Sequence, residues 1–163
     1  MKSRASVVFA IIAFLAFAGC RRSVQLSGGM APTIKAGEQV TIDYAAYALA
    51  SPQRWDVIAF KPPTPTNIVV LKRVIALPSE TITLTTNGIV VNGNFLTMPA
   101  FLSNAASFPP DKLLPSMGDV VKFPYTVPSN QYFVIGDNWS NSFDSRYYGA
   151  VPVTSILGRV MNK

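Results

Sequence analysis

The chain has 163 residues, of which 49% are hydrophobic, and this suits one domain or one domain with a small subdomain. It has no histidine and one cysteine, which excludes Ser-His-Asp and Cys-His catalysis, His-ligated metal sites and intramolecular disulfides. A hydrolytic base must then be Lys, Asp or Glu, and no cofactor or metal is expected. Four units of the net charge of +6 come from Lys2, Arg4, Arg21 and Arg22, so we expect no nucleic-acid surface.

Residues 1–22 form a separate segment, in which a basic start precedes the uncharged, almost wholly apolar stretch 5–19. Fifteen helical residues span roughly 22 Å, short of the roughly 30 Å hydrocarbon core. The segment therefore suits a short membrane anchor or the apolar part of a signal peptide. Phe17-Ala-Gly-Cys20 also resembles a lipoprotein processing site, at which Cys20 would be lipidated; the alternative is a small residue at the membrane edge. Each case predicts an exported chain, 23–163, held at a membrane.

Residues 24–33, VQLSGGMAPT, predict a strand that ends in a glycine pair. Gly28 and Gly29 let the backbone approach another group closely, and Pro32 rules out a helix interior. Further along, alternation and β-branched residues predict strands at 34–43, 67–77, 131–135 and 155–160.

Residues 79–128 are predicted to form a small inserted β subdomain. Its hairpin pairs 81–84 with 89–91 across Asn87-Gly88. The stretch 95–118 lacks clear periodicity and reads as a loop. No long amphipathic helix is found, so the fold class is all-β, with short twisted strands and Gly/Pro turns.

Lys72 and Arg73 interrupt the apolar strand at 67–77. Alternation places the two cations on opposite faces, and both faces carry apolar neighbours, so at least one charge is expected out of water. Burial lowers the pKa of a lysine, and a neutral amine can take a proton from a serine. The alternative is a lysine whose amine reaches solvent.

The loop at 136–149 is rich in Asn, Asp, Ser and Gly, which favour turns. Asp144 and Arg146 lie two residues apart in it, among serines and beside two tyrosines. This composition favours a partly buried polar network in which the charge pair supports the loop. A solvated loop with an incidental ion pair is the alternative.

The stretch GDNWSNSFDSRYYGAVP resembles the C-terminal signature of type I signal peptidases, GDNxxxSxDSRxxGxVP. Other family elements follow the right order: VLKRVIALPSE resembles KRVIGLPGD, and GIVVNG matches GxVxxNG. RWDVIAF resembles the family strand RGDIVVF, with Trp55 in place of glycine, which implies a strand at 54–60. The resemblance covers most of residues 23–163 and implies a signal-peptidase-like β core. The signature matches at Gly136, Asp137, Asn138, Ser142, Asp144, Ser145, Arg146, Gly149, Val151 and Pro152.

The nucleophile element is where the chain departs from this family. The family reads SxSMxPT, with the serine before Met as nucleophile, and the matching stretch here is SGGMAPT, residues 27–33. Gly29 therefore occupies the nucleophile position, and Ser27 matches the serine that helps to form the oxyanion hole. Ser27 is also the nearest hydroxyl that a backbone turn at the glycine pair can carry toward Lys72.

The resemblance implies a role for each matching residue. Lys72 is the general base, Ser142 hydrogen-bonds and orients it, and the backbone near Gly29 donates to the oxyanion. Substrates are signal peptides with small residues before the cut, because the pockets are shallow and apolar. Met30 and Pro32 are expected to contact substrate, and Asp137, Asn138, Asp144 and Arg146 to support the site.

Two functions follow from these residues. The first is a membrane-bound serine endopeptidase that removes signal peptides from exported proteins, acting on the periplasmic or extracellular side. The second is a catalytically inactive homologue that binds peptides or serves as a structural membrane protein, since Gly29 has no hydroxyl. A cytoplasmic self-cleaving repressor of the related Ser–Lys fold is a third reading, and the apolar N-terminus argues against it.

Overall fold

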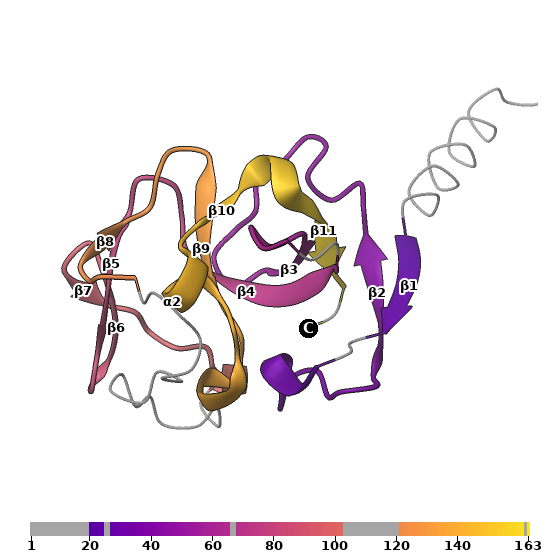
Figure 1. Ribbon diagram of the computed structural model, residues 1–163, viewed down its shortest axis with the longest axis horizontal. Helices are drawn as coiled ribbons and strands as arrows, with labels where there is room; N and C mark the ends of the chain where they lie inside the picture. Colours follow the sequence, from indigo (N-terminus) through magenta and orange to yellow (C-terminus); the bar gives the residue numbers. More distant parts are fainter. Residues whose placement is uncertain (1–19, 25–26, 66–67, 103–120, 162) are drawn as a thin grey trace, which may run out of the picture.

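Two β-sheets make up most of the computed structural model, which describes residues 20–24, 27–65, 68–102, 121–161 and 163. The larger sheet has seven strands in the order β1-β2-β11-β3-β4-β9-β10, and its hydrogen-bonded neighbours run antiparallel (Figure 1). Its strands are β1 (Cys20–Val24), β2 (Gln39–Asp43), β3 (Val57–Phe60), β4 (Val70–Ala76), β9 (Gln131–Ile135), β10 (Val151–Pro152) and β11 (Ile156–Val160).

The smaller sheet has the order β7-β6-β5-β8, and its strands all fall within the span 79–128. The hairpin expected there forms, with β5 and β6 paired from Ile82 opposite Val91 to Thr85 opposite Gly88. The strands are β5 (Thr81–Thr85), β6 (Gly88–Val91), β7 (Asn94–Phe95) and β8 (Tyr125–Thr126). The described residues also contain five short helical turns: η1 (Gly28–Met30), η2 (Ala100–Leu102), η3 (Trp139–Asn141), α2 (Ser145–Tyr148) and η4 (Val153–Ser155).

Strand β4 is an interior strand of the larger sheet, as its apolar sequence predicts. It pairs with β3 on one side and β9 on the other, and six of its seven residues are buried. The last strand, β11, lies between β2 and β3 rather than at an edge, so it joins the N-terminal strands β1 and β2 to the rest of the sheet. The all-β prediction is confirmed.

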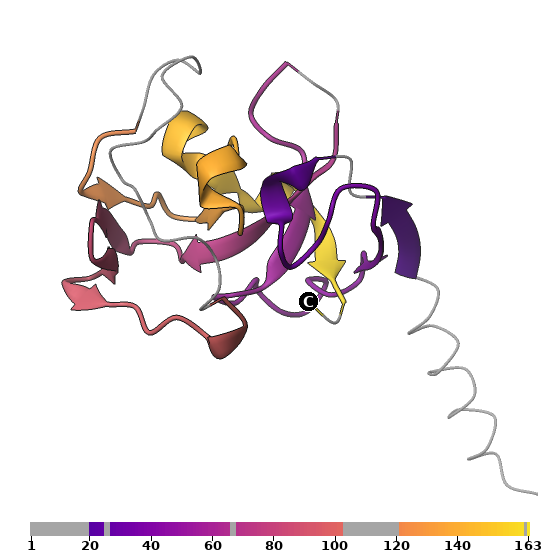
Figure 2. The same ribbon diagram turned by 90° about the horizontal axis from the view of Figure 1, so that it is seen from below.

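The two sheets share one hydrophobic cluster. It combines side chains of β4 and β9 with side chains of β5 and β6, so the smaller sheet is packed onto the larger one. Figure 2 shows the two sheets meeting along the continuous stretch from β4 into β5. A second cluster contains Val40 and Ile42 of β2, which are both buried in the core.

Two strands begin at residues other than those expected. Strand β1 begins at Cys20, inside the segment expected to end at residue 22. Strand β3 begins at Val57, because Trp55 adopts a left-handed backbone with φ of 76° that a strand does not contain. Trp55 stands where the family has glycine, and the positive φ explains why glycine suits that position. Most of the loop expected at 95–118 lies outside the described residues.

The N-terminal stretch 1–19 also lies outside the described residues, and so do the predictions made for it. Within the part of the chain that the structure describes, no helix has both the length and the apolar character needed to span a bilayer.

Candidate active site

Lys72 projects from the middle of β4 into a cavity of about 360 Å³. Its side chain is 4% exposed, and it forms no ion pair or hydrogen bond with any described residue. Burial lowers the pKa of the Lys72 amine; the charge of Asp144 acts in the opposite direction, and that of Arg146 adds to the lowering. A lysine held in this way carries a larger neutral fraction than a solvated one, as a general base requires.

Gly29 lies directly opposite this amine, in the turn η1. A Cβ atom on Gly29 would stand 3.0 Å from Lys72 Nζ, 3.5 Å from the Asn141 carbonyl oxygen and 3.6 Å from Ser142 Oγ. A serine at this position would therefore place its hydroxyl beside the amine. The structure thus brings residue 29 and Lys72 together, and residue 29 itself has no hydroxyl to place there.

Ser142 reaches the same point from the other side, but the hydrogen bond expected between its hydroxyl and Lys72 is absent. Ser142 is 2% exposed, and its Oγ has no hydrogen-bond partner. That prediction is wrong for this structure, although Ser142 Oγ and Lys72 Nζ both lie close to the position that a Cβ atom on Gly29 would occupy. An unpartnered buried hydroxyl is costly, so it marks Ser142 as a position where stability is not optimised.

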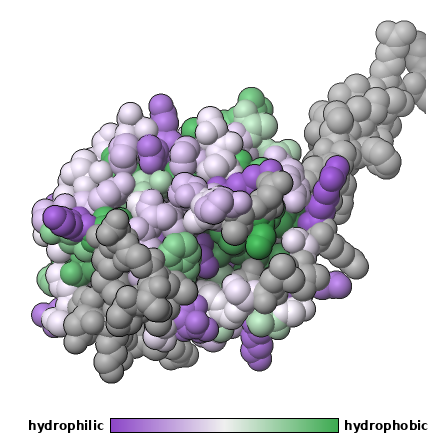
Figure 3. All heavy atoms as spheres, in the orientation of Figure 1, coloured by the Kyte–Doolittle hydropathy of each residue, from purple (hydrophilic) through white to green (hydrophobic). Residues whose placement is uncertain are grey.

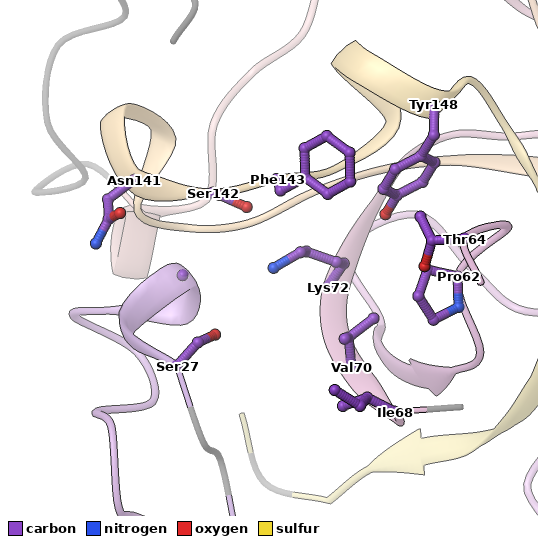
Figure 4. A pocket seen from close by; sticks show the side chains of 11 residues that line it. Ser27, Pro62, Thr64, Ile68, Val70, Lys72, Asn141, Ser142, Phe143 and Tyr148 are labelled. Carbon is purple, nitrogen blue, oxygen red and sulfur yellow. The ribbon is translucent and has the colours of Figure 1, made fainter. Parts of the chain in front are cut away.

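Ser27 precedes η1 in an extended conformation and is exposed. It lines the cavity together with Gly29 and Lys72, and Figure 4 shows its hydroxyl turned toward the cavity. The turn at residues 28–30 is closed by the Ala31 amide, which donates to the Gly28 carbonyl at 3.1 Å. The backbone therefore bends after Ser27, as the glycine pair permits.

Asn138 and Gly136 hold this turn in place from the signature loop. The Asn138 side-chain amide donates to the Gly28 carbonyl at 3.1 Å, and its backbone amide donates to the Gly29 carbonyl, also at 3.1 Å. A Cβ on Gly136 would lie only 2.3 Å from the Gly29 carbonyl oxygen and 2.2 Å from Ser142 Oγ. Only a glycine at residue 136 permits its backbone to pack this closely against Gly29 and Ser142.

Asp144 and Arg146 form a buried, bidentate salt bridge, which confirms the predicted pair. The Arg146 guanidinium donates to the two carboxylate oxygens at 2.7 and 2.9 Å, and the residues are 4% and 0% exposed. Asp144 also accepts from the Gly136 amide at 3.0 Å, and Arg146 donates to the Ser142 carbonyl at 3.1 Å. The pair thus fixes the backbone on both sides of the cavity wall.

A second buried salt bridge joins Arg73 to Asp137, and sequence reasoning did not predict this partnership. Arg73 is 0% exposed; its guanidinium donates to the Asp137 carboxylate at 2.8 and 2.6 Å and to the Trp55 carbonyl at 2.7 Å. An arginine on an apolar strand indicates that a buried acid pairs with it. The sequence does not indicate which acid, because Arg73 and Asp137 are 64 residues apart.

Met30 and Pro32 were expected to contact substrate, and neither lines the cavity. Met30 has no exposed surface and packs in the core with Ile34 and Val40, so it cannot reach a bound peptide in this conformation. Pro32 is exposed outside the cavity, and its role remains a prediction.

Apolar side chains that the sequence analysis did not single out form most of the cavity wall. Ile68 lies just before β4, Val70 begins it, and Phe143 and Tyr148 come from the signature loop and α2 (Figure 4). The Tyr148 hydroxyl is buried without a hydrogen-bond partner, and burial raises the pKa of this phenol. No cluster of three His, Cys, Asp or Glu side chains suited to a metal occurs among the described residues.

Comparison with known proteins agrees with the motifs. The family described as "Signal peptidase, peptidase S26" matches residues 2–162. The chain is 33% identical to "Signal peptidase I" of Leptolyngbya laminosa over 142 residues, covering 83% of this chain and 64% of that protein. It is 34% identical to "Signal peptidase I V" of Bacillus subtilis over 132 residues, covering 79% and 76%.

The fold is also similar to a solved structure. A crystal structure of a signal peptidase I from Enterococcus faecalis superposes with a TM-score of 0.52 at 33% identity, covering 67% of this chain and 96% of that one. The chain thus spans about two thirds of the length of the Leptolyngbya relative and nearly all of this structure. With its buried lysine opposite residue 29 and its ordered motifs, the chain belongs to the signal peptidase family, peptidase S26.

Proposed function

We propose that this chain is a membrane-held endopeptidase of the signal peptidase I type, which binds signal peptides of exported proteins and cleaves them with Lys72 as the general base. The observation that carries the proposal is the distance of 3.0 Å between Lys72 Nζ and the position that a Cβ atom on residue 29 would occupy, in a largely apolar cavity. Small apolar residues of an extended peptide suit such a wall.

For the chain as it stands, we assign the attack to Ser27, because Gly29 has no hydroxyl. Neutral Lys72 takes the Ser27 hydroxyl proton while the oxygen bonds to the scissile carbonyl carbon. The carbon–nitrogen bond then breaks, and the proton passes from Lys72 to the leaving amine. Water hydrolyses the resulting ester and frees Ser27. The position of Ser27 and Lys72 in one cavity supports this assignment.

A second candidate function is peptide binding without chemistry, and one observation favours it. The position closest to the amine is a glycine, while the supporting pairs Asp144–Arg146 and Arg73–Asp137 are complete. In this case Ser27 contributes only to binding, and the groove retains signal peptides without cutting them.

Processing of a preprotein by three forms separates the two functions. We compare the chain as written, Ser27→Ala and Gly29→Ser, each in vesicles and each with Lys72→Ala as the matched inactive control. Cleavage by the written chain that is lost in Ser27→Ala supports the endopeptidase. Cleavage that begins only with Gly29→Ser identifies an inactive homologue. If Gly29→Ser is also inert, the site itself is assigned wrongly.

Membrane attachment is part of the same proposal, with the domain on the exported side. It is supported by the uncharged stretch 5–19 and by the basic residues on both sides of it. Alkaline extraction of membranes distinguishes an anchored chain, which stays in the pellet, from a released one. Mass spectrometry of Cys20 then tells a lipidated cysteine from an unmodified one.

A further inference from the structure

The cavity has two ends of different composition. Figure 4 shows Ser27 and the Lys72 amine toward one end, where cleavage is proposed, and Pro62, Thr64 and Tyr148 at the other. On the face shown in Figure 3, hydrophobic surface gathers in a hollow over β4. Both ends belong to one cavity of about 360 Å³. A peptide held with its cleavage site at Lys72 can therefore extend a neighbouring side chain to the second end.

The Tyr148 hydroxyl lies at this second end without an acceptor for its proton. Its oxygen is buried, and no group in the described part of the chain forms a hydrogen bond with it. Burial raises the pKa of this phenol well above its ordinary value, so the hydroxyl stays protonated and is a donor at neutral pH. A buried donor without an acceptor destabilises the protein, because it has lost its hydrogen bonds to water. In a cavity, a bound ligand can supply the acceptor.

The ring that carries this hydroxyl is held in place by its neighbours. Tyr148 is the last residue of α2, and its amide donates to the Asp144 carbonyl at 3.4 Å. The ring meets that of Phe143 edge-on, with the centroids 5.3 Å apart, and packs against a core cluster from β3, β4 and β9. The hydroxyl is therefore presented at a fixed place, and a ligand bound there would lose little free energy in ordering the tyrosine.

We propose that Tyr148 is a specificity-determining residue, whose hydroxyl donates a hydrogen bond to the side-chain hydroxyl of a serine or threonine close to the cleavage site of the bound peptide. The inference rests on the proposed function, because the same cavity must hold the signal peptide. It adds a polar preference at one peptide position to a cavity that otherwise suits small apolar side chains.

The size and chemistry of serine suit this place. Its side chain is small, its oxygen can accept from Tyr148, and its own proton can go to a nearby backbone carbonyl of the peptide. An apolar side chain of the same size would fill the space and leave the Tyr148 hydroxyl buried without an acceptor. A site that hydrogen-bonds a substrate hydroxyl discriminates against the analogue that lacks it for this reason.

Binding of synthetic peptides to the full chain in detergent micelles tests the inference. The peptides span a signal-peptide cleavage site, carry alanine at the three positions before the cut, and have a methyleneamine bond in place of the scissile amide, so that binding is measured without cleavage. At each position in turn, serine is compared with 2-aminobutyrate, in which a methyl group replaces the hydroxyl. By fluorescence anisotropy, we expect serine to bind at least about fivefold tighter at one position.

Two matched variants assign this preference to one hydroxyl. Tyr148→Phe removes the hydroxyl and keeps the ring, so it should abolish the preference for serine. Its melting temperature should be unchanged or higher, since an unpartnered polar group leaves the interior. Tyr147→Phe changes the adjacent tyrosine, which does not line the cavity, and should keep the preference.

Four outcomes would contradict the inference. Equal affinities for serine and 2-aminobutyrate at all three positions overturn it and leave peptide binding standing. A preference that survives in Tyr148→Phe belongs to another group and overturns it as well. Equal weakening of every peptide by Tyr148→Phe shows that the hydroxyl bonds to the peptide backbone, which removes its role in specificity. If no peptide binds to the parent chain, the proposed function fails together with the inference.

Discussion

Lys72 and Arg73 are neighbours in β4, both are buried cations, and their surroundings differ. The Asp137 carboxylate balances the charge of Arg73 and accepts two of its hydrogen bonds, and the Trp55 carbonyl accepts another. Lys72, on the opposite face, meets a cavity, a glycine and an unpartnered serine, and its pKa is lowered by burial.

This difference separates a structural charge from one suited to chemistry. A buried charge with a complete set of partners stays charged and holds two segments together. A buried amine without partners loses its proton more readily, and it can then accept one from a substrate or a hydroxyl. Variants that remove a partner from one side, or the cation from the other, should therefore have opposite effects on stability.

The largest effect is expected for Asp144→Ala. The substitution leaves the Arg146 guanidinium buried without its acid and also removes the acceptor of the Gly136 amide. We expect a loss of about 5 kcal/mol in the free energy of unfolding, measured by urea denaturation. A loss below about 1 kcal/mol would show that Arg146 finds solvent instead.

Asp137→Ala tests the partnered side of β4 directly. It should cost about 4 kcal/mol, because Arg73 is 0% exposed and loses the carboxylate that balances its buried charge. The double variant Asp137→Ala with Arg73→Met should recover part of this loss, since it removes the unpaired charge. Equal stability of the single and double variants would argue that the charge itself is not the cause.

Lys72→Met should act in the opposite direction and raise the free energy of unfolding at neutral pH by about 1–2 kcal/mol, since an unpaired polar group leaves the core. Burial lowers the pKa of Lys72 in the folded state from its ordinary value of 10.5. At a pH between the lowered pKa and 10.5, the unfolded chain therefore binds more protons than the folded chain. The free energy of unfolding of the parent should therefore rise with pH across that window. Urea denaturation across this pH range should show that slope for the parent and a flatter one for Lys72→Met.

The smallest effect on stability is expected for Gly29→Ser. The new Cβ would lie 3.0 Å from the end of the flexible Lys72 side chain, which can shift by a few tenths of an ångström. We expect a change below about 1 kcal/mol. Any processing that this variant shows should increase as pH rises through the Lys72 pKa, because the base acts in its neutral form. A pH-independent rate would contradict Lys72 as the base.

Local patterns were sufficient for much of the fold. The hairpin at 81–91 was predictable because strand alternation and an Asn-Gly turn are encoded by adjacent residues. Strand β4 was predictable because a continuous apolar run has to be buried. The expected strand at 54–60 started too early, because the positive φ of Trp55 is imposed by its surroundings rather than by its own preference.

The sequence by itself determined the all-β class, the family motifs, the burial of at least one of the two cations on β4 and the absence of a hydroxyl at residue 29. These properties follow from residue types and short-range periodicity. Only the tertiary structure decided that Arg73 pairs with Asp137, that Met30 packs inside the core, and that Ser142 makes no hydrogen bond to Lys72. Each depends on how segments far apart in the chain pack, and such contacts are selected by the whole core rather than by the residues alone.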